Sequence, residues 1–371
     1  MNVFAWSFVM MLALVLIELA ILKKFRGQPV PWKEVIFNFN SGHILMWVFR
    51  GVEVAAFGLV LHHLNLHWVD RLPTAAQWLF ALIGWDFCFY WMHRMHHRWA
   101  FFWAVHHVHH EGEHFNLSLG IRNSWYSSLT SFPFVAILAV LGVPLEIFVV
   151  VSSLHYSVQF YNHNGLVGKS GWLDKVLVTP SNHRVHHGVD PVYRNRNFGG
   201  TFLLWDKLFG TYQAERDDIP ACYAEGPPHS SNPLWANNQR LSQLASTRWP
   251  RLQHLRRCAL PNRYIGSGGV LLFGLVIAYV GYGAAAGVGM QAVLFSLIFA
   301  ATIALGGISD EKLWGLLLWV GVGAALPLFL AGFFGAAPGW IVLLGAALAL
   351  HALAGLLIVM RGRASRPAGA L

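Results

Sequence analysis

Histidine is concentrated in two short stretches of this sequence. Seven of the eighteen residues from His93 to His110 are histidine, and residues 183–187 repeat the spacing H-x-x-H-H found at 106–110. A further histidine, His163, lies alone between the two stretches. Imidazole is the commonest metal ligand in proteins, and histidines three or four residues apart share one face of a helix. The spacing therefore predicts metal binding by side chains on packed helices.

Eight of these histidines, in one pair and two triplets, follow spacings that place several imidazoles on one side of a helix, and the isolated His163 makes nine. A structural zinc ion takes about four ligands, so nine imidazoles favour two metal ions over one. The alternatives are scattered solvated or core histidines, or a histidine-rich metal-buffering tract. Interleaved Trp, Phe and Val residues favour packed helices instead. The candidate ligands are His93, His97, His106, His109, His110, His163, His183, His186 and His187.

The composition indicates a membrane protein. Of the 371 residues, 56% are hydrophobic and 12% are charged, whereas soluble domains carry about 25% charged residues. The net charge of +9 arises from basic residues in loops beside apolar segments. Membrane topology and anionic headgroups account for such residues better than nucleic acid does. The sequence has three cysteines and no C-x-x-C motif, so we expect neither a disulfide scaffold nor a cysteine-ligated metal site.

The apolar segments predict an all-α, polytopic fold. The run Val3–Leu22 is too long for a signal-peptide core and lacks a basic start, so we expect it to be retained. The basic cluster 23–26 indicates that this helix ends in the cytoplasm. Arg50 and Glu53 are near neighbours on the second span, and they either pair or mark an interfacial segment. The predicted spans are residues 3–22, 44–64, 75–91, 270–287, 292–307, 313–333 and 340–360.

Residues 128–161 are expected to form a helical hairpin, because Gly142-Val143-Pro144 interrupts a long apolar run. We divide the chain into N-terminal transmembrane helices (1–74), a catalytic domain (75–265) and a C-terminal four-helix transmembrane region (266–371). This topology places every candidate ligand on the cytoplasmic face, where a di-metal site would cap the helix bundle. We favour a bacterial inner membrane, since the tail has no compartment signal.

The predicted site favours oxidative chemistry. Zinc hydrolysis needs about three ligands and an open position, so nine histidines are too many. Two iron ions held by neutral imidazoles could activate O2 for hydroxylation, desaturation or oxidative cleavage of a lipid. Each turnover needs two external electrons, and the sequence shows no flavin, haem or iron–sulfur motif to deliver them.

Two readings from other classes compete with an oxygenase. A metal transporter would need histidines and acidic residues along its spans, whereas here they gather at one face. A non-catalytic lipid-binding or structural protein would not need a nearly complete ligand set. His351, alone in an apolar span, is expected to be a satisfied packing residue.

Three motifs resemble the fatty acid hydroxylase / sterol desaturase superfamily of membrane di-iron enzymes. These motifs are Asp86–Arg94, His106–His110 and Thr179–Gly188, and the resemblance covers residues 84–215. Further residues are similar to the alkylglycerol monooxygenase-like branch. They are Phe115-Asn116-Leu117-Ser118, Arg122 and Trp205-Asp206-Lys207-Leu208-Phe209-Gly210-Thr211-Tyr212.

The resemblance implies two iron ions, O2 as co-substrate and ligand roles for all nine candidate histidines. It also implies hydroxylation of a lipid C–H bond, with ether-lipid cleavage or desaturation as alternatives. The electron donor would be a ferredoxin, a cytochrome b5-like protein or a reduced pterin. Some members carry a further histidine where this chain has Gln159, and His155 lies off that spacing. Gln159, water or Glu111 are the candidates to fill that coordination position.

Other polar residues are candidates for supporting roles. A metal-bound histidine normally donates its second N–H to a carboxylate or a carbonyl. The candidate carboxylates are Asp86, Glu111, Asp174 and Asp206, with helix packing as the alternative for Asp86 and a turn or cap for Asp206. Arg122 and Arg184 either hold a lipid phosphate or carboxylate, or set the membrane topology. We expect His96, His107 and His114 to be supporting or surface residues and not metal ligands.

Overall fold

The computed structural model describes residues 3–224, 230–247, 256–283, 287–333 and 339–364. In these ranges the fold is all-α, as predicted, and the only β-type pairings are two isolated bridges. The long helices are α1 (Val3–Arg26), α2 (Trp32–Leu64), α3 (Thr74–Arg98), α5 (Ser127–Val140), α6 (Leu145–Asn162), α10 (Asn262–Tyr282), α11 (Val288–Ser309), α12 (Leu313–Phe333) and α13 (Gly339–Ala364). The shorter elements are α4 (Ala100–His110), η1 (Leu119–Ile121), η2 (Leu173–Lys175), α7 (Pro180–His187), α8 (Leu204–Leu208) and α9 (Pro233–Leu244).

Six helices of the described ranges are long and apolar enough to cross a membrane, namely α1, α2, α10, α11, α12 and α13. The multi-pass prediction therefore holds, with corrected bounds. The second helix starts at residue 32 rather than 44, and the span predicted at 270–287 starts at 262, while its residues 284–286 lie outside the described ranges. The predicted span 75–91 is not among the six, because Gln77, Asp86 and the terminal histidines lower the hydropathy of α3.

The predicted hairpin at 128–161 is present as α5 and α6. Helix α5 ends in a Schellman-type turn, in which Gly142 N–H donates to the Ala139 carbonyl (3.0 Å) and Val143 N–H to the Leu138 carbonyl (2.9 Å). Gly142 has φ +92°, and a Cβ there would meet Asn65 Oδ1 at 2.5 Å. Glycine therefore allows both the left-handed turn and the close approach of the α2–α3 loop.

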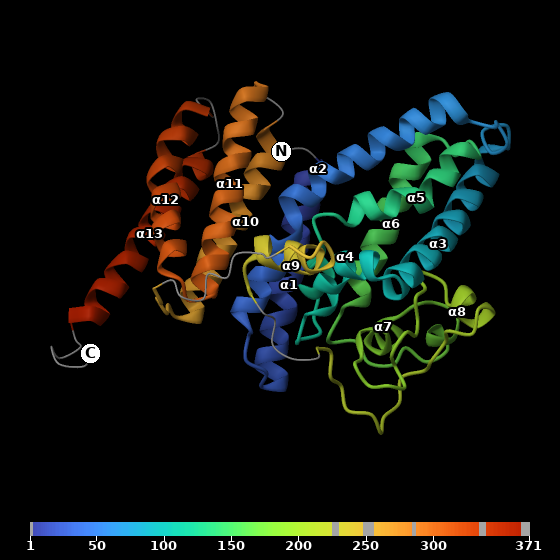
Figure 1. Ribbon diagram of the computed structural model, residues 1–371, viewed down its shortest axis with the longest axis horizontal. Coiled ribbons are helices and arrows are strands. Elements are labelled where there is room, and N and C mark those ends of the chain that lie inside the picture. The colour runs from blue at the N-terminus through green and yellow to red at the C-terminus, as the bar shows by residue number, and fades with distance from the viewer. Residues whose placement is uncertain (1–2, 225–229, 248–255, 284–286, 334–338, 365–371) are drawn as a thin grey trace.

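Two large apolar cores, besides a small cluster of Phe37, Val108 and Ala236, hold the described helices together. One joins α1 and the start of α2 to α10–α13, as in the contact of Phe39 with Phe273 at 4.8 Å between ring centroids. The other joins α2, α3, α5 and α6, where Phe57 stacks on Phe148 at 3.8 Å. Figure 1 shows α10–α13 on one side and α3–α6 on the other, with α2 running between them and α7 and α8 below α3. Helix α2 thus belongs to both halves of the molecule.

The predicted pairing of Arg50 with Glu53 is present on α2, with 2.6 Å between Arg50 Nη1 and Glu53 Oε2. Arg50 also donates to Ser152 of α6 (2.5 Å), and Glu53 accepts from Ser131 of α5 (3.0 Å). The pair therefore joins three helices at once. Because both charges are hydrogen-bonded inside the bundle, they are paired in the way that buried charges require.

Candidate metal centre

Four segments carry the candidate ligands to one place. Helix α3 ends at Arg98, and Trp99 in extended conformation (φ −107°, ψ 128°) turns the chain into α4. Helix α7 starts at a capping box formed by Thr179 and Asn182, with Pro180 in its first turn. The sources of the nine histidines are the end of α3 (His93, His97), α4 (His106, His109, His110), the end of α6 (His163) and α7 (His183, His186, His187).

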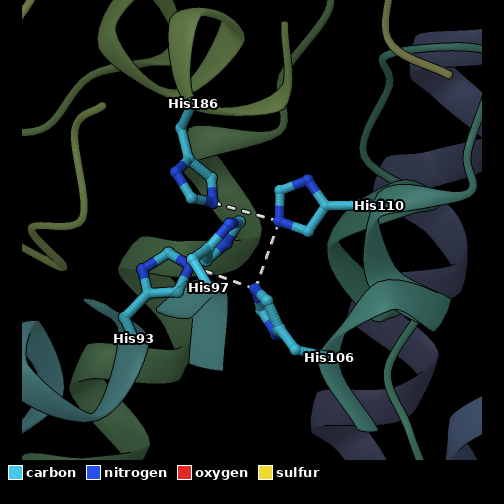
Figure 2. Close-up of side chains that lie close together, drawn as sticks. All are labelled: His93, His97, His106, His110 and His186. Carbon is cyan, nitrogen blue, oxygen red and sulfur yellow. Dashed lines mark hydrogen bonds between the residues drawn. The ribbon is translucent and has the colours of Figure 1, made fainter. Parts of the chain in front are cut away.

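Five of the nine histidines form one group. One ring nitrogen of each lies within 4.8 Å of those of the other four, and the members are His93, His97, His106, His110 and His186. Figure 2 shows the five rings pointing toward a common centre from different segments. His106 Nε2 lies 3.1 Å from both His93 Nε2 and His110 Nε2, and the His110 and His186 Nε2 atoms are also 3.1 Å apart.

The remaining four histidines form a second group, with His163 at its centre. Its Nε2 lies 3.2 Å from His109 Nε2, 3.2 Å from His187 Nε2 and 3.0 Å from His183 Nε2. All four side chains are buried. The two groups are adjacent, since the rings of His110 and His187 stack at 4.4 Å. All nine candidates thus lie in two neighbouring groups, and none lies apart.

The second group has the electronic arrangement of a metal site. His109 Nδ1 donates to the Arg122 carbonyl and His163 Nδ1 donates to the Gln159 carbonyl, both at 2.7 Å. Burial lowers the pKa of His109 to about 4 and that of His163 well below its usual range. A neutral imidazole has a single N–H, so both Nε2 atoms carry lone pairs, and these face each other. A metal cation between the two Nε2 atoms can accept both lone pairs. A hydrogen bond between the two atoms cannot form, because neither carries a hydrogen.

The first group repeats this arrangement. His93 Nδ1 donates to the Phe198 carbonyl and His186 Nδ1 donates to the Arg196 carbonyl, both at 3.0 Å. Burial lowers the pKa of His186 to about 3, so its Nε2 also carries a lone pair toward the centre. His97 Nε2 is buried and has no hydrogen-bond partner. The donor set therefore fits an ion that prefers nitrogen ligands, such as iron, zinc or copper.

Backbone carbonyls, rather than the predicted carboxylates, accept the N–H groups of His93, His109, His163 and His186. Asp206 instead accepts from the amides of Phe198 (2.8 Å) and Gly199 (2.7 Å), and from Thr211 Oγ1 (2.7 Å). Asp206 therefore fixes the backbone that presents the Phe198 carbonyl to His93. The prediction of a direct contact was wrong because buried amides of the loop compete for the carboxylate.

The other predicted carboxylates also act on the backbone. Asp86 of α3 accepts from Thr201 N (2.7 Å), Phe202 N (3.2 Å) and Trp205 Nε1 (2.9 Å), and so ties the same loop to α3. Asp174 accepts from Thr179 Oγ1 at 2.5 Å, next to the start of α7. These carboxylates position ligand-bearing segments without touching an imidazole that faces either centre.

The buried Arg122 pairs with the half-buried Glu111 beside α4, with 3.3 Å between Glu111 Oε2 and Arg122 Nη2. Glu111 also lies 3.5 Å from His107 Nε2, so it faces away from both histidine groups. Arg122 is 1% exposed and its guanidinium lies over the Phe37 ring at 4.1 Å. The predicted contact of Arg122 with a lipid phosphate or carboxylate is therefore wrong, because a fully buried guanidinium does not reach a lipid headgroup, whereas its role in membrane topology stays a prediction.

Arg184 is likewise engaged within the protein. Its guanidinium makes a bidentate pair with Glu215, at 2.6 Å from Nε to Oε1 and 2.8 Å from Nη2 to Oε2. Its Nη1 also donates to the Val167 carbonyl (2.8 Å). Arg184 thus fixes α7 against the flanking loops and leaves little capacity for a lipid phosphate.

Gln159 does not reach the second group. Its Nε2 donates to the Gly200 carbonyl at 2.5 Å, while its backbone carbonyl orients His163. His155 is 2% exposed and packs on Phe89 at 4.2 Å between ring centroids. Neither Gln159 nor Glu111 therefore supplies a fifth ligand in this conformation.

The spare histidines lie outside both groups. His96 hydrogen-bonds to the Met92 carbonyl and to Thr130, and His107 donates to the Ala104 carbonyl. His114 Nδ1 lies 2.6 Å from Glu34 Oε2, and this hydrogen bond raises the pKa of His114. Each has protein partners, which agrees with the supporting or surface roles predicted for them.

Sequence reasoning missed Glu18 in α1. Its carboxylate accepts from the amides of Leu117 (2.6 Å) and Gly165 (2.7 Å), two residues after His163. Glu18 is 1% exposed, and so it ties the first helix to the turn beside the second group. An acidic residue in an otherwise apolar span was the available signal.

The comparisons with known proteins agree with this site. Residues 78–211 match the fatty acid hydroxylase family. Alkylglycerol monooxygenase from Xenopus tropicalis is 33% identical over 211 residues, which cover 56% of this chain and 46% of that protein. Alkylglycerol monooxygenase from Homo sapiens is 30% identical over 244 residues, covering 64% of this chain and 54% of that protein.

A bacterial relative is also similar. The ornithine lipid hydroxylase OlsE from Rhizobium tropici is 30% identical over 150 residues, covering 39% of this chain and 44% of that protein. No solved structure matches the chain. Residues 78–211 of the chain therefore resemble the fatty acid hydroxylase family. Within it, the similarity is to the alkylglycerol monooxygenase-like branch, and the chain spans about half the length of the curated relatives it matches.

Proposed function

We propose that this chain is a membrane di-iron oxygenase that hydroxylates a C–H bond of a lipid with O2 and external electrons. The observation that carries the proposal is the gathering of nine imidazoles into two adjacent groups whose ring nitrogens converge. We assign all nine as metal ligands of the catalytic site. Two adjacent nitrogen-rich centres suit the redox chemistry of iron better than the single hydrolytic centre of a zinc enzyme.

The lipid substrate is supported by the family and by the membrane helices. Relatives are named for alkylglycerols and for an ornithine lipid, and both names denote lipids. The site lies at the ends of α3, α4 and α6, outside the six membrane-spanning candidates. A substrate could keep its polar head at the interface while its chain reaches the metals. This placement also disfavours a metal transporter, which needs ligands along its spans.

The residues of this chain have distinct tasks in the proposed reaction. Two iron ions, when bound, would supply the activation of O2. The histidines hold the metals, and the carbonyls of Phe198, Arg196, Arg122 and Gln159 fix four of the rings in the tautomer that presents Nε2. Overall, one oxygen atom enters the C–H bond, the other leaves as water, and two electrons and two protons are consumed.

The electrons would come from a separate donor. We keep a ferredoxin, a cytochrome b5-like protein or a reduced pterin as candidates, since the sequence shows no reductase motif of its own. We further propose that the site faces the cytoplasm, because Lys23, Lys24 and Arg26 end α1 on the side of the site. The division at residues 74 and 265 and the bacterial inner membrane remain predictions from the sequence.

A test is to purify the protein in detergent, load it with ferrous iron without oxygen, and measure bound iron and reductant-dependent O2 uptake. We expect about two irons per chain, and we expect both iron and O2 uptake to be lost in His109→Ala. His62→Ala, an exposed histidine on α2, is the matched control. Tight zinc without O2 uptake after iron loading would overturn the proposal.

A second candidate is cleavage of ether lipids, supported by the relatives named alkylglycerol monooxygenase. Hydroxylation of the carbon beside the ether oxygen gives a hemiacetal, which separates into an aldehyde and a glycerol. Product analysis with an alkylglycerol distinguishes the two candidates. Release of a fatty aldehyde indicates ether cleavage, whereas a hydroxylated intact lipid indicates simple hydroxylation, and a new double bond indicates desaturation.

A further inference from the structure

Four large apolar side chains are exposed on the lower segment that carries α7 and α8. Trp172 is 70% exposed, Val176 52%, Leu204 56% and Leu208 64%. We call these four residues the cap patch. Two of them flank η2 and two belong to the short helix α8, which lies beside α7 in Figure 1. Such a gathering marks an interaction surface rather than ordinary scatter.

The backbone brings the two parts of the cap patch together. Residues 176–178 and 201–203 pair in antiparallel fashion around the bridge between Leu177 and Phe202. Leu203 N–H donates to the Val176 carbonyl at 3.0 Å. The Lys207 ammonium also donates to the Lys175 carbonyl, so η2 and α8, which carry the two parts of the cap patch, adjoin each other.

The cap patch continues an apolar stripe on α3. Leu79, Ile83 and Phe87 are 59%, 43% and 39% exposed, and their spacing of four places them on one face of the helix. The opposite face, with Ala81 and Trp85, is buried against the helical core. The exposed stripe is thus the side of α3 that faces outward beside the membrane helices.

An aromatic contact joins the stripe to α8. The rings of Phe87 and Trp205 meet edge to face, with 4.9 Å between centroids and 67° between planes. Trp205 Nε1 also donates to Asp86 of α3 at 2.9 Å. The cap patch and the exposed face of α3 are therefore adjacent and lie on the same side of the molecule.

The exposed charged residues of η2 and α8, beside the cap patch, are positively charged. Lys175 and Lys207 are exposed beside it, and they belong to η2 and α8 themselves. Asp206 is buried by its bonds to backbone amides, and Asp174 accepts from Ser170 N at 2.6 Å. The exposed charged groups of these two elements are therefore cationic, which suits anionic headgroups.

We propose that the cap patch rests in the headgroup region of the bilayer, with Trp172, Leu204 and Leu208 in lipid and the two lysines at anionic headgroups. Tryptophan and lysine at an interface favour this depth. The same segment also has a polar rim, where the Asp217 side chain is 90% exposed and pairs with Lys169. The inference rests on the membrane embedding of the chain and is independent of the proposed oxygenase activity.

The test uses the full chain with Cys222, the exposed native cysteine, replaced by serine, while Cys88 and Cys258 stay buried. Single cysteines are introduced as Leu208→Cys and Leu204→Cys in the cap patch, Leu79→Cys on α3, and Asp217→Cys on the polar rim. Each is labelled with a small fluorophore. The proteins are reconstituted into phosphatidylcholine vesicles, with and without phosphatidylglycerol, that contain lipids with a nitroxide near the headgroup.

We expect the nitroxide lipid to quench the Leu208→Cys and Leu204→Cys labels several-fold more than the Asp217→Cys label. Quenching at these two positions should deepen with phosphatidylglycerol, and Lys175→Gln with Lys207→Gln should remove that increase. Quenching in the cap patch equal to that at Asp217→Cys would overturn the proposal, and so would a Leu79→Cys label that the lipid does not quench. Two cap-patch positions guard against a variant that folds poorly.

Discussion

The two histidine groups differ in number and in surroundings. The first has five imidazoles drawn from α3, α4 and α7, and the second has four drawn from α4, α6 and α7. A metal with five protein ligands is held more firmly than one with four, whereas the latter keeps more room for an external ligand. If both groups bind metal as proposed, we expect the first centre to retain its metal and the second to exchange it more readily.

The largest effect is expected for His163→Ala. His163 is the member whose Nε2 lies within 3.2 Å of the other three nitrogens of its group. Its removal leaves three imidazoles, so we expect the bound metal to fall by about one ion per chain, with complete loss of O2 uptake. Metal analysis of the purified protein measures this.

His114→Ala is the matched control for that variant, because His114 lies outside both groups and is exposed. Retention of both metals in His163→Ala would contradict the four-histidine centre. Loss of both metals in His114→Ala would show that the variants report on folding rather than on ligation.

A smaller effect is expected for His97→Ala in the first group. Four imidazoles remain there, so we expect the metal to stay bound and to leave faster during competition with a chelator. The rate of release compared with that of His163→Ala sharpens the comparison of the two centres. If His97→Ala and His163→Ala release metal equally fast, the number of histidines in a group does not decide how firmly it holds its metal.

Asp206→Asn tests the loop that orients His93. The side-chain amide of the asparagine would bring an N–H group against a backbone N–H. The Asp206 carboxylate now accepts a hydrogen bond from that backbone N–H, and this bond would be lost. Loss of one such buried hydrogen bond costs about 1–3 kcal/mol of the free energy of unfolding. Changes of this kind near a metal weaken its binding roughly 10- to 100-fold. Thermal unfolding with and without chelator measures both.

The effect of Asp206→Asn should fall on the first centre, since Asp206 binds the amide of Phe198, whose carbonyl orients His93. Asp217→Asn, on the exposed rim of the same segment, is the control. Equal weakening of both centres would indicate a general loss of stability instead of a local one.

The smallest effect is expected for Gln159→His. This change places a fifth imidazole one helical turn before His163. We expect slower release of metal from the second centre and little change at the first. Release that is unchanged, or faster because the bond to Gly200 is lost, would show that position 159 cannot reach the metal.

The sequence was a good guide where local periodicity decides the outcome. The spacing of four between His93 and His97 and the two H-x-x-H-H triplets marked helical faces, and those side chains do gather. The break at Gly142 likewise predicted the α5–α6 hairpin. The span predicted at 75–91 is not among the candidate membrane spans, because polar residues such as Gln77 and Asp86 lower the hydropathy of α3.

Contacts between distant segments were beyond the sequence. The carbonyls of Phe198 and Arg196 orient histidines from other elements, and no residue type signals such a role. Arg122 is buried over Phe37 although a charged residue in a loop normally faces water. These outcomes depend on which backbone groups are left unpaired after packing.

The sequence alone determined the membrane class, the helical fold and the identity of the nine histidines, because composition and helical spacing are local properties. Only the tertiary structure decided how the nine divide into five and four, and which carbonyl faces which ring. It also placed Glu18 of the first helix beside the turn after His163. The reason is physical: ligand sharing and hydrogen-bond pairing depend on distances between segments, which the spacing of residues along the chain does not set.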